Sequence, residues 1–184
     1  MDAQTPTSGS PTRDERVGVA LGDRSMTLTR WINAPRERVW RAWTDPAELA
    51  QWWGPHGYTN LVAEFDAAPD APYRIVMHSP EGIDYPISGH LIEVDPPNRL
   101  VFTDEAVDMP PDWQAVLDDY TPSTPRGTEL RIHVTVTFDE RDGGTLLTIA
   151  SRFASDEERD AVVRMGAASG WSESLEKLDR LVTA

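Results

Sequence analysis

Histidine and aspartate side chains supply the candidate acid and base groups of this chain. His78 and His90 fall in neighbouring strand-like segments, and an imidazole titrates near neutral pH, so either could act as a hydrogen-bonding or acid–base group in a pocket. Asp104 ends a third such segment, and Asp84 and Glu105 are further acidic candidates. A carboxyl group that is removed from water in a pocket would show a raised pKa. We treat His78, His90 and Asp104 as the candidate catalytic residues; the simpler alternative is that each is an ordinary strand residue in contact with water.

Other catalytic classes find no support in the sequence. The four histidines are too scattered to give the spacing of a zinc site, and His133 shares a strand face with polar residues. The chain has no cysteine, which removes thiolate nucleophiles and disulfides. There is no Gly-x-Ser-x-Gly nucleophile motif, and no glycine-rich loop that would hold a phosphate or a dinucleotide. We therefore expect neither a metal nor a cofactor.

Charge and length limit the partners and the domain organisation. The 184 residues include 31 acidic and 17 basic residues, giving a formal net charge of −14, so nucleic acids and anionic membrane surfaces would be repelled. No run approaches the roughly 20 apolar residues that span a bilayer, and no leader-like segment opens the chain. We expect no nucleic-acid partner, no membrane insertion and a cytoplasmic location. We predict a disordered tail over residues 1–16, rich in Ser, Thr and Pro, and a single domain over 17–184.

The elements that must position the candidate groups follow from hydrophobic period and turn residues. Alternation near Met26 and Leu28 predicts a first strand within 17–32. Pro35 indicates the start of a short helix, and Asp45 is placed to cap a second. Six more strands are predicted over 59–66, 73–78, 87–94, 99–104, 129–139 and 145–153. From a capping box at Ser155, the remaining sequence to residue 184 is helical in composition.

Tryptophan-rich segments at the two ends of this strand region point to a family. One end carries Val39-Trp40-Arg41-Ala42-Trp43-Thr44-Asp45-Pro46 and Gln51-Trp52-Trp53-Gly54-Pro55, and the other carries Gly170-Trp171 followed by a leucine stripe. Together they resemble the activator-of-heat-shock-ATPase branch of the START-related helix-grip superfamily, also called SRPBCC or Bet v-like. The resemblance implies an α+β fold, with a curved antiparallel sheet of about six or seven strands around a long C-terminal helix and two short helices after the first strand.

Two departures from the family pattern stand out. The family commonly has a glycine pair before the Tyr-Arg of the third strand, whereas residues 69–72 here read Pro-Asp-Ala-Pro. The segment 105–128 is longer than a hairpin requires and is rich in Pro and Asp. Trp113 with Val116, Leu117 and Tyr120 could form one or two helical turns that fold over a pocket mouth. The alternative is a surface insertion with a small cluster of its own.

The resemblance also implies a function, because the space between helix and sheet in this superfamily usually holds a small, largely apolar molecule. We expect such binding here, with an apolar or aromatic ligand. The alternatives are an enzyme of the polyketide cyclase, aromatase or dehydratase type, and a module that activates a chaperone ATPase; a homodimer is plausible. The residues predicted to contact the ligand are Trp53, Met77, His78, His90, Phe102, Trp113, Phe153, Met165 and Trp171.

Overall fold

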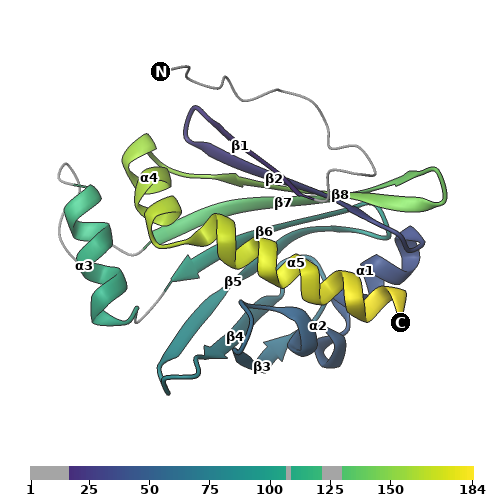
Figure 1. The fold of residues 1–184 in the computed structure, drawn as a ribbon, viewed down its shortest axis with the longest axis horizontal. Coiled ribbons are helices and arrows are strands. Elements are labelled where there is room, and N and C mark those ends of the chain that lie inside the picture. The colour runs from purple at the N-terminus through teal and green to yellow at the C-terminus, as the bar shows by residue number, and fades with distance from the viewer. Residues whose placement is uncertain (1–16, 107–108, 122–129) are drawn as a thin grey trace.

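The computed structural model describes residues 17–106, 109–121 and 130–184. Eight antiparallel strands form one curved sheet in the order β1-β2-β8-β7-β6-β5-β4-β3 (Figure 1). The strands are β1 Val17–Gly22, β2 Ser25–Ile32, β3 Thr59–Phe65, β4 Pro72–His78, β5 Asp84–Asp95, β6 Arg99–Ala106, β7 Leu130–Arg141 and β8 Gly144–Arg152. The tail predicted over 1–16 lies outside the described residues.

The first strand of the sequence prediction is a hairpin of two strands. β1 pairs with β2 from Val17 opposite Arg30 to Gly22 opposite Ser25. The chain reverses through a tight turn in which Arg24 has a φ of 46°, a conformation that is uncommon for a residue with a Cβ. The alternation that predicts a single strand continues on both sides of this turn. The sheet therefore has eight strands instead of six or seven.

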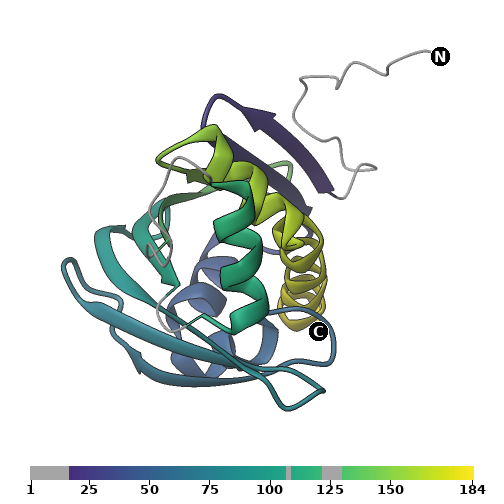
Figure 2. The same ribbon diagram turned by 90° about the vertical axis from the view of Figure 1, so that its left-hand side faces the viewer.

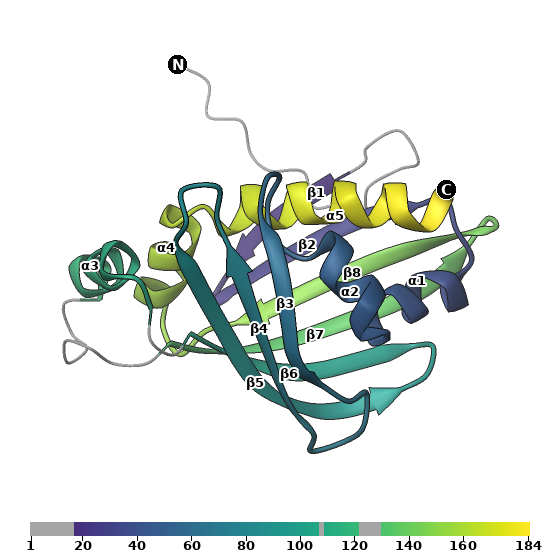
Figure 3. The same cartoon turned by 90° about the horizontal axis from the view of Figure 1, so that it is seen from below.

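Five helices accompany the sheet: α1 Arg36–Thr44, α2 Pro46–Trp52, α3 Pro111–Tyr120, α4 Asp156–Arg164 and α5 Ala167–Thr183. Two short helices after the N-terminal strands are present as expected, and Asp45 caps α2 by accepting hydrogen bonds from the backbone N–H groups of Ala47 (2.9 Å) and Glu48 (3.2 Å). α1 and α2 carry the chain from β2 to β3, at the far edge of the sheet (Figure 3). None of the helices in the described residues is both long and apolar enough to cross a membrane.

The C-terminal helical segment is broken in the middle. α4 ends before Gly166, whose φ of 90° is a left-handed conformation that glycine adopts without steric cost, and α5 begins at the next residue. This break lets α5 lie across the concave face of the sheet while α4 turns away beside α3 (Figures 1 and 2). Leu175 and Leu178 of the predicted stripe are buried, and Leu181 is half-buried beside the buried Val182.

Aromatic side chains fill one end of the space under α5. Trp43 and Trp52 are buried, and their rings lie 4.8 Å apart. The indole of Trp171 from α5 stacks on Trp43 at 6.1 Å and meets Trp53 edge-on at 5.1 Å. Edge-to-face and offset contacts of this kind are the favoured geometries of aromatic rings. Because this cluster occupies only one end, the other end of the enclosed space is available for the cavity described below.

Candidate ligand-binding cavity

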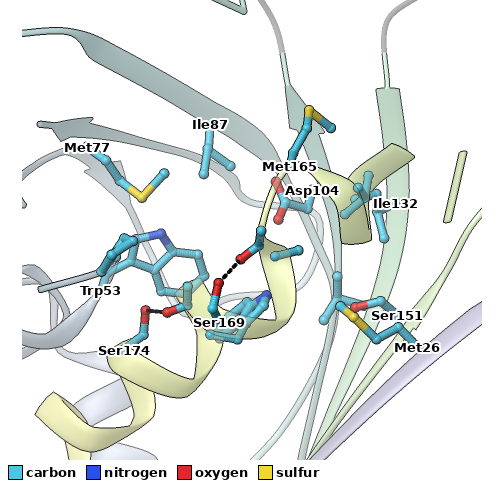
Figure 4. Close-up of a pocket in the computed structure, with 18 of the residues that line it drawn as sticks. Met26, Trp53, Met77, Ile87, Asp104, Ile132, Ser151, Met165, Ser169 and Ser174 are labelled. Carbon is cyan, nitrogen blue, oxygen red and sulfur yellow. Dashed lines mark hydrogen bonds between the residues drawn. The ribbon is translucent and has the colours of Figure 1, made fainter. Parts of the chain in front are cut away.

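A cavity of about 320 Å³ lies between α5 and the concave face of the sheet. This volume falls in the range of about 300–1,000 Å³ that small-molecule sites have. Its wall is mostly apolar, and Figure 4 shows side chains converging on it from the sheet, from the loop after α2 and from the helices. The sheet contributes Met26, Met77, Ile87, Asp104, Leu130, Ile132, Val134 and Ser151, and the remainder comes from Trp53, Gly54, Pro55, Tyr58, Trp113, Phe153, Val162, Met165, Gly166, Ala167, Ser169, Gly170, Trp171, Glu173 and Ser174.

Three tryptophans from distant parts of the chain line this cavity. Trp53 follows α2 and is only 6% exposed, and Trp171 comes from the first half of α5. Trp113 comes from α3, where its ring packs 4.8 Å from the ring of Tyr85 on β5. Figure 2 shows α3 in front of the space that the sheet and α5 enclose. In the described part of this segment, α3 borders the cavity through Trp113, and Leu117 of the same helix is buried in the main core instead of in a separate cluster.

The loop that carries Trp53 is fastened to α5. The Lys177 ammonium donates hydrogen bonds to three successive backbone carbonyls, those of Trp53 (3.1 Å), Gly54 (3.0 Å) and Pro55 (3.4 Å). Burial lowers the pKa of Lys177, against the opposing effect of Glu173. Gly54 has a φ of 78°, and a Cβ on it would stand 3.0 Å from the sulfur of Met77, so the tight turn needs glycine. The Asn60 side chain on β3 also donates a hydrogen bond of 2.6 Å to the Trp53 carbonyl, so the wall at Trp53 is held in place by both α5 and the sheet.

Asp104 is the ionisable group in the sheet wall of the cavity. It lies on β6 opposite Ile132, and its carboxyl group is directed toward the cavity below Met165 (Figure 4). Burial raises its pKa to about 7, and the neighbouring Glu105 carboxylate adds to this effect. Glu105 itself lies on the other face of the strand, where Arg131 approaches it at 3.0 Å. No described residue donates a hydrogen bond to the Asp104 carboxyl group.

The other polar groups around the cavity are hydroxyls and one further acid. Ser169 and Ser174 of α5 donate to the carbonyls of Gly166 (2.9 Å) and Gly170 (2.8 Å), so these hydroxyls are satisfied within the helix. Ser151 on β8 is buried beside the cavity. Glu173 accepts a hydrogen bond of 2.8 Å from the backbone N–H of His56. Burial raises the pKa of Tyr58, with additional effects from Tyr85, Glu81 and Glu173.

Most of the residues predicted to contact a ligand lie around this cavity. They are Trp53, Met77, Trp113, Phe153, Met165 and Trp171, and the candidate acid Asp104 joins them. Sequence reasoning missed Met26, Ile132 and Ser151. The alternation of β2, β7 and β8 was the available signal for these three, because each points to the same face as its buried neighbours two residues away.

His78 and His90, predicted as candidate catalytic and ligand-contacting residues, do not line this cavity. His78 follows Met77, so strand alternation turns its imidazole to the outer face, where Nδ1 lies 2.6 Å from the carboxylate of Asp84 and the side chain is 54% exposed. His90 is exposed and follows Gly89, whose missing Cβ leaves room for the carbonyl of Thr103. The alternation of side chains along a strand predicts that neighbouring residues face opposite sides of the sheet, but it does not identify the one that faces the cavity.

Phe102, also predicted to contact a ligand, does not line the main cavity. It shares the concave face of β6 with Asp104 but lies closer to the packed core, where its ring meets that of Tyr73 edge-on at 5.8 Å. A small void of about 20 Å³ borders it there instead of the main cavity. A shift of two residues along one strand therefore separates core packing from the cavity wall.

A curved antiparallel sheet that holds a C-terminal helix over an internal cavity defines the helix-grip class of ligand-binding domains. Within that class, residues 33–183 match the family described as Activator of Hsp90 ATPase homolog 1-like protein. The match spans most of the chain, so the chain belongs to this family. The helix-grip resemblance predicted from the tryptophan-rich segments is confirmed.

Solved structures agree with this assignment. Protein Ms6760 from Mycobacterium smegmatis is 29% identical, with a TM-score of 0.75 over 91% of this chain and 96% of that chain. The AHSA1 protein from Silicibacter pomeroyi is 28% identical, with a TM-score of 0.64 over 86% and 97% of the two chains. A protein from Arthrobacter aurescens, at 23% identity and a TM-score of 0.76 over 90% and 91%, supports the fold. No curated protein matched the sequence.

Proposed function

We propose that the chain binds a small, mostly apolar molecule with an aromatic part in the cavity under α5. The observation that carries this proposal is the 320 Å³ cavity with Trp53, Trp113 and Trp171 in its wall. Large flat side chains bury much apolar area of a ligand and restrict its orientation. Membership in a family of helix-grip domains supports the same reading.

Blocking the cavity tests this proposal. Ile87 lines the cavity from β5, and Ile87→Trp would place an indole in the space that a ligand needs. The matched control is Ile92→Trp on the same strand, because Ile92 is 45% exposed and lies outside the cavity. Titration calorimetry with a neutral aromatic probe, 2-naphthylmethanol, is expected to show binding to the unsubstituted protein and to I92W, and a loss of at least about tenfold in I87W. Equal affinity in all three would contradict the proposal.

A second candidate function is acid–base catalysis in the same cavity, favoured by Asp104. A carboxyl group with a pKa of about 7 is partly protonated near neutral pH, so it can donate a proton to a carbonyl or to a leaving oxygen. This role corresponds to the cyclase-like or dehydratase-like alternative, with Asp104 in place of the two histidines. For a substrate that the cavity binds, Asp104→Asn should retain binding and lose turnover. Full turnover in that variant would exclude Asp104 as the acid.

A further inference from the structure

The cavity has an unusual distribution of charge. Two carboxyl groups line it, those of Asp104 and Glu173, and among the described lining residues there is no lysine, arginine or histidine side chain. Lys177 is close by, but its ammonium is directed to the carbonyls of the loop at Trp53. An acidic ligand such as a fatty acid would find repulsion here and no cationic partner. The wall of the cavity is suited to a positively charged ligand.

Among the described residues Asp104 has no hydrogen-bonding partner, and a ligand could supply one. Its carboxyl group faces an apolar cavity, and no described residue donates a hydrogen bond to it. Asp104 is half-buried, and a carboxyl group that is largely removed from water is normally paired, because a carboxylate without a donor loses hydration and gains nothing in return. The hydroxyls of Ser169 and Ser174 cannot supply the pairing, since both donate to helix carbonyls. A donor on the ligand would complete the site.

The aromatic wall favours the same kind of ligand. Trp53, Trp113 and Trp171 line the cavity together with Tyr58. The negative face of an aromatic ring attracts a cation, and tryptophan is the strongest of the aromatic side chains in this respect. The net charge of −14 on the whole chain further raises the local concentration of cations. The Asp104 carboxyl group, which no described residue pairs with, the aromatic rings and the net charge therefore all favour a cationic ligand.

We propose that the ligand carries a protonated amine on an aromatic or aliphatic body, and that this amine pairs with the Asp104 carboxylate in the cavity that the three tryptophans help to line. This inference rests on the proposed function and adds the chemical class of the ligand. The apolar body occupies the space beside Met26 and Ile132, and the amine donates its hydrogen bonds to Asp104. Glu173, on the first half of α5, adds a second negative charge.

Three probes with the same ring system and different charge test the inference. They are 2-naphthylmethylamine, which is cationic, 2-naphthylmethanol, which is neutral, and 2-naphthoate, which is anionic. Titration calorimetry of the full chain at pH 7.5 is expected to show the amine binding at least about tenfold more tightly than the alcohol, because hydrogen bonds to charged groups exceed neutral ones. The anion is expected to bind most weakly.

Two variants distinguish the effect of the Asp104 carboxylate on amine binding from the effect of the overall net charge. Asp104→Asn should abolish the preference for the amine over the alcohol. Asp84→Asn removes the same unit of charge from an exposed position beside His78, so it should keep the preference. Thermal unfolding of both variants verifies that they fold.

The outcomes distinguish the inference from the proposed function. Equal affinity for the amine and the alcohol, or a preference that persists in D104N, would overturn the amine assignment while leaving the cavity as a binding site. No binding of any of the three probes would overturn both. Loss of the preference in D84N as well would show that overall charge, and not the cavity, selects the amine, and would likewise overturn the inference.

Discussion

The ammonium of Lys177 donates a hydrogen bond of 3.1 Å to the backbone carbonyl of Trp53, which ties α5 to the loop that forms one wall of the cavity. Lys177 is the only lysine in the sequence, and it serves two further carbonyls of the same loop. These carbonyls follow the end of α2, where backbone acceptors lack partners within the helix. The contact therefore contributes both to stability and to the shape of the cavity.

Replacing this lysine should be costly. Lys177→Met keeps most of the side-chain length and removes all three donors, so we expect the free energy of unfolding to fall by about 1–3 kcal/mol. Arg180→Met is the matched control, since Arg180 lies on the same helix with a side chain that is 75% exposed. Urea unfolding followed by tryptophan fluorescence measures both. A loss in R180M as large as that in K177M would contradict the anchoring role.

The raised pKa of Asp104 predicts a specific dependence of stability on pH. The unfolded carboxyl group ionises near 3.8 and the folded one near 7, so between these values the folded state binds more protons. The free energy of unfolding contributed by this group therefore falls as the pH rises through that window. Above pH 7 the folded protein bears the full cost of the buried charge, on the order of 2–4 kcal/mol.

Asp104→Asn removes this term while other carboxyl groups stay unchanged. The stability of D104N relative to the unsubstituted protein should therefore increase between pH 4 and pH 8, by the amount estimated above. Chemical denaturation at a series of pH values gives the difference directly. Two curves that run parallel over the whole range would show that Asp104 titrates as in the unfolded chain.

The close packing of β5 and β6 at Gly89 leaves no room for a side chain at this position. A Cβ at this position would lie 1.9 Å from the carbonyl oxygen of Thr103, which also accepts a hydrogen bond of 2.9 Å from the hydroxyl of the buried Tyr73. Gly89→Ala must push β5 away from β6, and we expect a loss of about 2–4 kcal/mol or failure to fold. Ser88→Ala, one residue earlier, should change stability by less than about 1 kcal/mol. Similar unfolding midpoints for the two variants would refute the close approach.

Trp113 should matter to binding more than to folding. It is half-buried on α3 and lines the cavity, whereas Tyr120 on the same helix is exposed and outside it. Trp113→Ala is expected to weaken binding of 2-naphthylmethanol by about tenfold, because about 1–2 kcal/mol of aromatic contact is lost. Tyr120→Ala should leave the affinity unchanged. An unchanged affinity in W113A would remove α3 from the binding site.

Most of the sheet was predictable because its strands alternate. In β7 the buried Ile132, Val134 and Val136 alternate with more exposed residues, and the predicted strand 129–139 corresponds closely to Leu130–Arg141. The helix cap at Asp45 was also predictable, because capping depends only on residues that are adjacent in the sequence. The turn at Arg24 was missed, because arginine is not a typical residue at positive φ and no change of period marks it.

The candidate site was harder to predict because it depends on contacts between distant segments. Trp53, Trp113 and Trp171 were proposed from their residue type and from the family resemblance, and the fold brings them together. The face of the sheet toward which the His78 side chain points would be reversed by a shift of one residue, and the hydrophobic period does not fix this register at the end of a strand. Whether a described residue pairs with Asp104 depends on what packs around it from β7 and α5, which no local pattern contains.

The central claim is that a small aromatic molecule enters the space between α5 and the sheet. The seven tryptophan indole N–H signals in a ¹H–¹⁵N NMR spectrum test it most directly, because each signal reports on a known place in the fold. Addition of 2-naphthylmethanol should shift the signals of Trp53, Trp113 and Trp171 and leave that of Trp31, which does not line the cavity, in place. A spectrum in which none of these three signals moves, or in which only Trp31 responds, would contradict the account.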